Sequence, residues 1–213
     1  MGTSTRRMNK KIRDLLQQNN YETFDLAIPD VYKEVMRSKA VNRFYSEEFS
    51  VAIGVGIRGL KAINEGTFRE EFNFDGSIKD DALTKQKIIE SIIDIVGEEA
   101  FEEDSLVKTA LKYALTESVL KDDEARQLYL FMQSFCSYLM YLLISSQAEV
   151  LGENFMNISA TEMDDKIKKV AQDIVSNSLN QTILAFLAGQ VDIQTLIKAI
   201  SDKASSFKVI GES

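Results

Sequence analysis

The sequence contains no histidine and no tryptophan, and it has only one cysteine and one proline among 213 residues. The absence of histidine excludes Ser-His-Asp and Cys-His catalysis and removes the commonest ligand of transition metals. The single Cys136 cannot form an intramolecular disulfide, which indicates a reducing compartment, so we expect a cytoplasmic protein. Because Cys136 lies inside an apolar run, we expect it to be a buried small hydrophobic residue.

The single proline and ten glycines leave few turn signals for a β-rich fold. Apolar residues instead recur at spacings of three, four and seven, which is the periodicity of amphipathic helices. With 45% apolar residues the chain can bury a substantial core. We therefore predict an all-α fold, a helical bundle of about eight helices. Residues 12–213 are expected to form a single α-helical domain, with any subdivision near 65–78 or 97–104, behind a flexible basic N-terminal arm of residues 1–11.

Capping residues, glycines and the proline set the expected helix boundaries. Pro29 suits the first turn of an early helix, Gly66 and Gly189 can end helices, and Ser159 with Glu162 forms a capping motif. The expected helices lie at about 12–16, 29–44, 47–64, 80–96, 107–119, 123–148, 159–189 and 192–200. Three aromatic residues of the connection after Gly66 are expected to pack onto the core or a partner: Phe68, Phe72 and Phe74.

The most apolar run, from Leu128 to Ile144, is the one candidate for a membrane span. It contains three polar residues, and acids rather than cations follow it. These features favour a central core helix, so we expect no membrane association.

The segment Gly54-Val55-Gly56-Ile57-Arg58-Gly59 matches the G-x-G-x-x-G pattern of dinucleotide-binding loops. In that role a strand precedes the glycines and a helix follows, so that backbone N–H groups reach a pyrophosphate. The alternative places the glycines along a helix with Ala52 and Ala62, where small residues let another helix approach closely. The lack of a second strand rich in Val and Ile favours close packing.

Three pairs of adjacent aspartates are the other candidates for chemistry: Asp80-Asp81, Asp122-Asp123 and Asp164-Asp165. Paired carboxylates can bind a divalent ion or act as general acid and base. Each pair stands at a predicted helix start, where aspartate caps the N-terminus and interacts with the helix dipole. No serine occurs in a hydrolase motif. We therefore predict a non-enzymatic protein with no cofactor and no metal.

Positive charge is concentrated at the N-terminus. Residues 1–13 carry five cations and no acid, whereas residues 14–213 hold 20 basic against 33 acidic residues, a net charge of −13 within an overall charge of −8. Because phosphate affinity depends on Lys and Arg, we expect no direct nucleic-acid binding by the acidic body. Arg6 stands where the N-myristoylation pattern needs Ser or Thr, which disfavours a lipid anchor.

Gly2 is the most reactive group that the sequence offers. Methionine aminopeptidase removes Met1 before a small residue, which would expose the Gly2 α-amine with a pKa of about 7.7–8.0. This partly neutral amine is a nucleophile for acylation, so we predict Gly2 as a modification site. The following small residues are expected to thread into a partner's pocket, and the cations to dock on its acidic rim. The predicted partner-binding residues are Thr3, Ser4, Thr5, Arg6 and Arg7.

The Met-Gly-Thr-Ser start, the small residues from Ala52 to Gly66 and the run from Leu128 to Leu179 together resemble QatB, a component of the four-gene Qat anti-phage defence systems. The family usually continues the start with a Gly/Ser/Pro-rich stretch, whereas here Thr5-Arg6-Arg7 leads directly into a helix. The resemblance implies a subunit that works with an ATPase, a QueC-like enzyme and a TatD-like nuclease. In that setting the QueC-like enzyme installs a 7-deazaguanine group on the Gly2 amine.

Two other functions remain open from the sequence. The chain is alternatively a small helical adaptor or regulator that binds one protein partner through an exposed apolar groove and ignores its terminus. A nucleotide-binding protein that uses Gly54, Gly56 and Gly59 is the third hypothesis.

Overall fold

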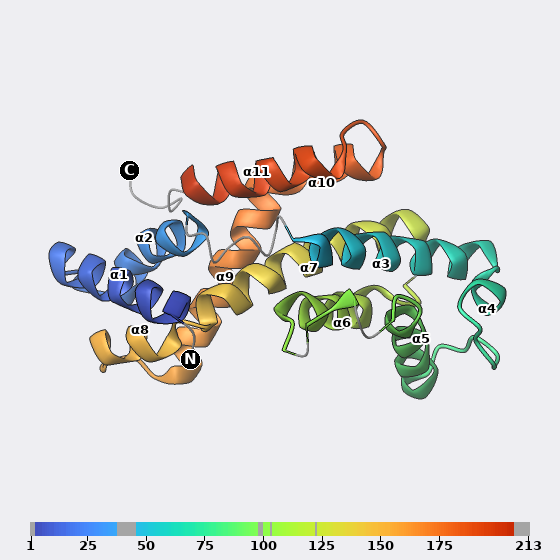
Figure 1. The fold of residues 1–213 in the computed structure, drawn as a ribbon, viewed down its shortest axis with the longest axis horizontal. Coiled ribbons are helices and arrows are strands. Elements are labelled where there is room, and N and C mark those ends of the chain that lie inside the picture. The colour runs from blue at the N-terminus through green and yellow to red at the C-terminus, as the bar shows by residue number, and fades with distance from the viewer. Residues whose placement is uncertain (1–2, 38–45, 98–99, 103, 122, 207–213) are drawn as a thin grey trace.

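The computed structural model of the protein describes residues 3–37, 46–97, 100–102, 104–121 and 123–206. Within these ranges the chain forms helices and no strand, so the predicted all-α fold is confirmed. The helices form an elongated bundle (Figure 1). In chain order they are α1 (Thr3–Asn19), α2 (Phe24–Arg37), α3 (Glu47–Glu65), α4 (Phe68–Glu71), α5 (Ala82–Asp94), α6 (Leu106–Ser118), α7 (Glu124–Ser145), α8 (Ala148–Asn154), α9 (Ala160–Ile174), α10 (Asn180–Leu187) and α11 (Ile193–Ser206).

Helix α7 lies in the middle of the bundle and packs against α3, α6, α9 and α10. Its buried residues include Phe131, Phe135 and Cys136, all fully enclosed. Among the described residues, α7 is the one helix whose length and composition would suit a membrane span, and half of its most apolar stretch is buried inside the fold. This is the position of the predicted core helix. The buried apolar residues from α1 to α11 form one connected core.

Several predicted boundaries are confirmed. Gly66 follows α3 with a left-handed φ of 76°, and its N–H donates to the carbonyls of Ala62 and Ile63. The Ser159 side chain caps α9 by accepting a hydrogen bond from the Glu162 N–H at 3.1 Å. Gly189, after α10, has a φ of 70°. The sequence predicted these helix ends correctly because a capping serine or a left-handed glycine satisfies backbone groups that are unpaired at the end of a helix.

Other boundaries differ from the prediction. Helix α2 begins at Phe24, so Pro29 lies inside it rather than in its first turn. The predicted helix at 123–148 ends at Ser145, because the Ser146 hydroxyl donates to the Leu143 carbonyl at 2.6 Å and α8 starts a new direction. The predicted segment 159–189 is divided by a π-helical turn at Val175–Leu179. The second half of the predicted helix at 29–44 falls outside the described residues.

The aromatic residues after Gly66 do pack onto the core. Phe68 is fully buried, and its ring stacks on Phe72 with centroids 4.7 Å apart and meets Phe74 edge-on at 5.5 Å. The Arg58 guanidinium lies over the Phe72 ring at 5.3 Å and pairs with Glu71 at 2.9 Å. This cluster closes the end of the bundle formed by α3 and α4 (Figure 1).

At the N-terminus the structure has a helix where the sequence suggested a flexible arm. Helix α1 already begins at Thr3, so it includes residues 3–11. The physical reason is an apolar stripe that starts before Ile12. Met8 stands four residues before Ile12 and is 5% exposed, so it extends the buried helix face by one turn.

Candidate partner-binding site at the N-terminal helix

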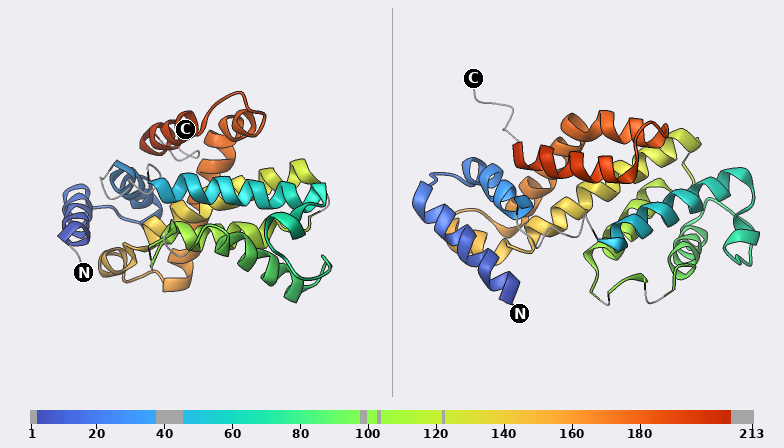
Figure 2. Two further views of the ribbon diagram at one scale, coloured as in Figure 1. Left: turned by 45° about the vertical axis from the view of Figure 1, so that its right-hand side comes forward. Right: turned by 45° about the horizontal axis from the view of Figure 1, so that its top comes forward.

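Helix α1 has a buried face and a cationic face. Met8, Ile12 and Leu16 recur every four residues and are at most 5% exposed, so they bind the helix to the core. Arg6 and Arg7 are exposed. The helix lies at one end of the molecule, next to α2 and α8 (Figure 2).

Two of the other N-terminal cations hold α1 in place. Lys11 pairs with Glu34 of α2, with 3.0 Å between Nζ and Oε1. Arg13 forms a forked pair with Glu153 of α8, with its Nη2 2.8 Å from Oε2 and 3.1 Å from Oε1 and its Nε 3.1 Å from Oε2. Both pairs are partly exposed, so each contributes about 0.2–1 kcal/mol and serves mainly to orient the helix.

The turn between α1 and α2 is fixed by a small polar network. The Tyr21 hydroxyl donates to Asp30 at 2.6 Å and accepts from the Asn19 amide at 3.0 Å, and Lys33 pairs with Asp30 at 2.9 Å. Burial, followed by the bond to Asp30, raises the pKa of Tyr21 to about 12. Asn20, with a φ of 46°, supplies the left-handed residue at which the chain reverses. Helix α1 is thereby held against α2 at both its middle and its end.

The remaining cations of α1 are available to a partner. Arg6, Arg7 and Lys10 are exposed, and none of them forms an ion pair with another residue that the structure describes. They project from a protein whose residues 14–213 carry a net charge of −13. The result is a local positive surface at one end of an acidic molecule, which attracts an acidic surface of another protein.

The predicted site residues fall into two groups. Arg6 and Arg7 are exposed on α1, as a docking role requires. The predicted modification site Gly2 lies outside the described residues. Thr3, Ser4 and Thr5 belong to the first turn of α1, but their side chains are outside the described part.

The dinucleotide-loop hypothesis is wrong. Gly54, Gly56 and Gly59 all lie inside α3, with no strand before them and no turn between them. Their N–H groups therefore belong to a continuous helix and cannot converge on a pyrophosphate. The close-packing alternative is confirmed for two of the three glycines: a Cβ on Gly56 would lie 2.2 Å from Phe131 of α7, and one on Gly59 would lie 2.6 Å from Ile92 of α5, whereas Gly54 is exposed and has no atom within 4 Å of an added Cβ.

Four of the other candidates for chemistry have structural roles, and Asp122 lies outside the described residues. Cys136 is fully buried, and this burial raises the pKa of its thiol to about 12, so no thiolate is available near neutral pH. Asp81 and Asp123 cap α5 and α7 by accepting bonds from backbone N–H groups. Asp164 accepts from the Tyr141 hydroxyl at 2.5 Å and pairs with Lys168 at 3.2 Å. Across the described ranges, no three or more His, Cys, Asp or Glu residues are grouped to hold a metal ion.

Sequence reasoning missed the acids that anchor α1. Glu153 stands 140 residues after Arg13 in the chain, and Glu34 stands 23 residues after Lys11. An exposed ion pair between distant helices leaves no spacing or motif in a single sequence. The sequence shows the excess of cations at residues 1–13. It does not show which of these cations anchor α1 and which stay exposed.

Comparison with protein-family models, curated proteins and solved structures found no match to this chain.

Proposed function

We propose that this protein is a non-enzymatic helical subunit that binds a partner protein through its N-terminal helix. The observation that carries the proposal is the exposed set Arg6, Arg7 and Lys10 on a helix whose other cations, Lys11 and Arg13, are engaged in anchoring it. A rigid helix presents these charges in a fixed pattern, which lowers the entropy lost when a partner binds. The partner has an acidic rim, and the acidic body makes no direct contact with nucleic acid.

The finer proposal is that the partner belongs to a cytoplasmic anti-phage defence complex. The resemblance to QatB supports it and implies a QueC-like enzyme, together with an ATPase and a TatD-like nuclease. The QueC-like enzyme acylates the Gly2 α-amine with a 7-deazaguanine group that bears an activated carboxyl. The amine nitrogen forms a bond to the carbonyl carbon and loses a proton, and the activating group leaves with the bonding electrons. The chemistry is done to this chain, and the chain needs no cofactor of its own.

Co-expression with the neighbouring genes, followed by intact-protein mass spectrometry and sequencing of the N-terminal peptide, tests this function. We expect loss of Met1, a mass increase on Gly2 that matches a deazaguanine acyl group, and a stable complex. The variant R6E/R7E is expected to lose both modification and complex, because it reverses the docking charges. The control K169E/K198E makes the same change in net charge on exposed positions of α9 and α11 and is expected to keep both.

An unmodified Gly2 without any stable complex overturns the proposal. A complex that R6E/R7E abolishes while Gly2 stays unmodified refutes the acylation and leaves binding through α1. Retention of Met1 also refutes the acylation, since no Gly2 amine would then exist.

A second candidate function is favoured by an open groove between α5 and α6. In this case the chain is a small adaptor that binds one protein partner through the groove and ignores its terminus. Deletion of residues 1–8 separates the two functions, because only binding through α1 requires that segment.

A further inference from the structure

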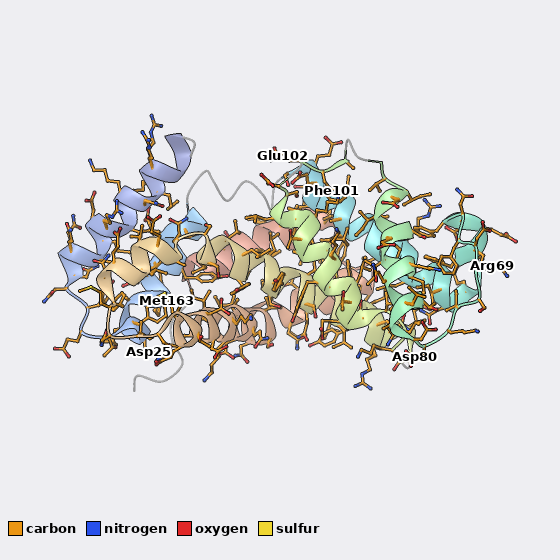
Figure 3. The ribbon with its side chains drawn as sticks, turned by 90° about the horizontal axis from the view of Figure 1, so that it is seen from below. Asp25, Arg69, Asp80, Phe101, Glu102 and Met163 are labelled. Carbon is orange, nitrogen blue, oxygen red and sulfur yellow. The ribbon has the colours of Figure 1, made fainter. Side chains whose placement is uncertain are left out.

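A groove of about 470 Å³ runs between α5 and α6, at the end of the bundle away from α1 (Figure 1). Ile89 and Ile93, four residues apart on α5, form its apolar floor and are 9% and 6% exposed. Asp80, just before α5, is labelled in Figure 3 at this end of the molecule. The floor is thus an apolar strip that follows the helix axis.

The two rims of the groove carry opposite charges. Glu90 and Asp94 lie four residues apart on α5, and Lys108 and Lys112 lie four residues apart on α6. Within the ranges that the structure describes, none of these four side chains forms an ion pair. The fifth charged lining residue, Lys85, is paired with Asp80, which lies outside the lining, at 2.6 Å. Glu90 also accepts a hydrogen bond from the Gln86 amide at 2.9 Å, which leaves its charge in place, so each rim presents two charges of one sign.

The acidic rim continues into exposed apolar surface. Leu83 is 62% exposed and stands seven residues before Glu90, so both share one face of α5. Leu83 thus adds exposed apolar surface on the outer side of the acidic rim. Leu83 lies within the stretch of α5 that lines the groove, residues 82–94, so it widens the docking surface at this rim and does not lengthen it.

We infer that this groove binds an amphipathic helix of a partner protein. The apolar stripe of that helix packs on Ile89 and Ile93, its acidic edge faces Lys108 and Lys112, and its basic edge faces Glu90 and Asp94. The groove is lined over residues 82–94 of α5 and 108–116 of α6, about 18 Å and about 12 Å of helix. It therefore accommodates two to three turns of the partner.

A small molecule fits this groove less well. Small-molecule sites hold a few convergent polar groups that fix the ligand's orientation. Here the charged residues stand on two separate rims, and Glu90, Asp94 and Lys112 are exposed. The opposite rims also set the direction of a bound helix, because reversing the helix exchanges its edges and brings like charges together.

The inference deepens the second candidate function, and it is tested on the purified full-length chain without any N-terminal partner. The probe is a helix-stabilised synthetic peptide of about 14 residues, with leucines on one face, glutamates along one edge and lysines along the other. We expect saturable binding by fluorescence anisotropy. In protein labelled at the isoleucine δ1 methyl groups, the Ile89 and Ile93 signals are expected to shift, whereas that of Ile12 in α1 stays in place.

Charge reversal gives the decisive comparison. The variant K108E/K112E is expected to weaken peptide binding by about 10-fold or more, because both rims are then acidic. The variant E90K/D94K/K108E/K112E exchanges the two rims, so the same peptide binds in the reverse direction and affinity returns. K169E/K198E, the matched control, is expected to bind like the unchanged protein, and circular dichroism checks that each variant is folded.

The inference is overturned if the peptide does not bind, if it shifts methyl groups away from Ile89 and Ile93, or if K108E/K112E binds as tightly as the unchanged protein. Failure of the fourfold variant to recover affinity, with its fold intact, refutes the charge complementarity. None of these outcomes depends on Gly2 or α1. Failure of the groove is therefore distinguishable from failure of N-terminal docking.

Discussion

Replacing Gly56 by alanine tests whether this glycine serves the close packing of α3 against α7. Gly56 lies inside α3 against the ring of Phe131 in α7. An added Cβ would lie 2.2, 2.7 and 2.9 Å from three ring carbons, Cζ, Cε2 and Cε1. Phe131 is fully buried, so its ring cannot move into solvent to make room. Gly54 is the matched control, because it is exposed in the same helix and has no atom within 4 Å of an added Cβ.

The expected difference follows from two opposing effects. Alanine gains about 1 kcal/mol of helix propensity over glycine at either position. Overpacking of a buried contact costs about 1–3 kcal/mol, and it applies at Gly56 alone. Because the gain is common to both variants, Gly54→Ala should be more stable than Gly56→Ala by about 1–3 kcal/mol. For a chain of this length, each kcal/mol corresponds to about 2–4 °C in Tm.

Urea unfolding followed by circular dichroism measures this difference at constant temperature, with thermal unfolding as a second measurement. The stability effects of changes at Gly56 and Phe131 are also expected to be coupled. Phe131→Leu removes the ring, so its cost should be smaller in the Gly56→Ala background than in the unchanged protein. If Gly56→Ala is as stable as Gly54→Ala, or if the two changes are additive, the close approach of α3 and α7 is refuted.

Three further results are expected. Burial raises the pKa of the Cys136 thiol to about 12 in the folded protein. As the pH rises, the thiol therefore loses its proton in the unfolded chain before it does so in the folded chain. The free energy of unfolding should therefore fall between pH 8.5 and 10 by up to about 1.4 kcal/mol per pH unit, and an unchanged slope in C136A, by urea titration, would contradict this. R6E/R7E should change the free energy of unfolding by less than about 0.5 kcal/mol and Ile12→Ala by about 2–5 kcal/mol; equal losses would contradict the two-faced α1. Ser159→Ala should cost about 1 kcal/mol, and Ser159→Asp should restore it.

Helix boundaries were predictable where they depend on local chemistry. Gly66 and Ser159 act through backbone groups within one turn, so a single sequence contains the whole cause. The early start of α2 depends on tertiary packing. Pro29 removes one N–H from α2, but the buried residues on both sides of it hold the helix together. Such competition between local preference and burial is not visible in the spacing of residues.

The sequence predicts the positive charge of the candidate site, but it does not predict the helix that carries this charge or the ion pairs that anchor that helix. The cations of residues 1–13 are plain in the sequence, yet the helix that carries them depends on Met8 reaching the core. The separation of Arg6 and Arg7 from Lys11 and Arg13 depends on Glu34 and Glu153, which come from two other helices. The groove between α5 and α6 had no sequence signal, since its rims are ordinary charges at helical spacing.

The positions of the two proposed surfaces bear on how the protein works in a complex. Helix α1 lies at one end of the molecule and α5 toward the other, in both views of Figure 2. A partner docked on Arg6 and Arg7 therefore leaves the groove open to a second protein. The two sets of residues share no contact. R6E/R7E should therefore leave binding at the groove unchanged, and K108E/K112E should leave binding at α1 unchanged. If both proposed surfaces are used at once, the chain holds two partners together and raises the effective concentration of one for the other.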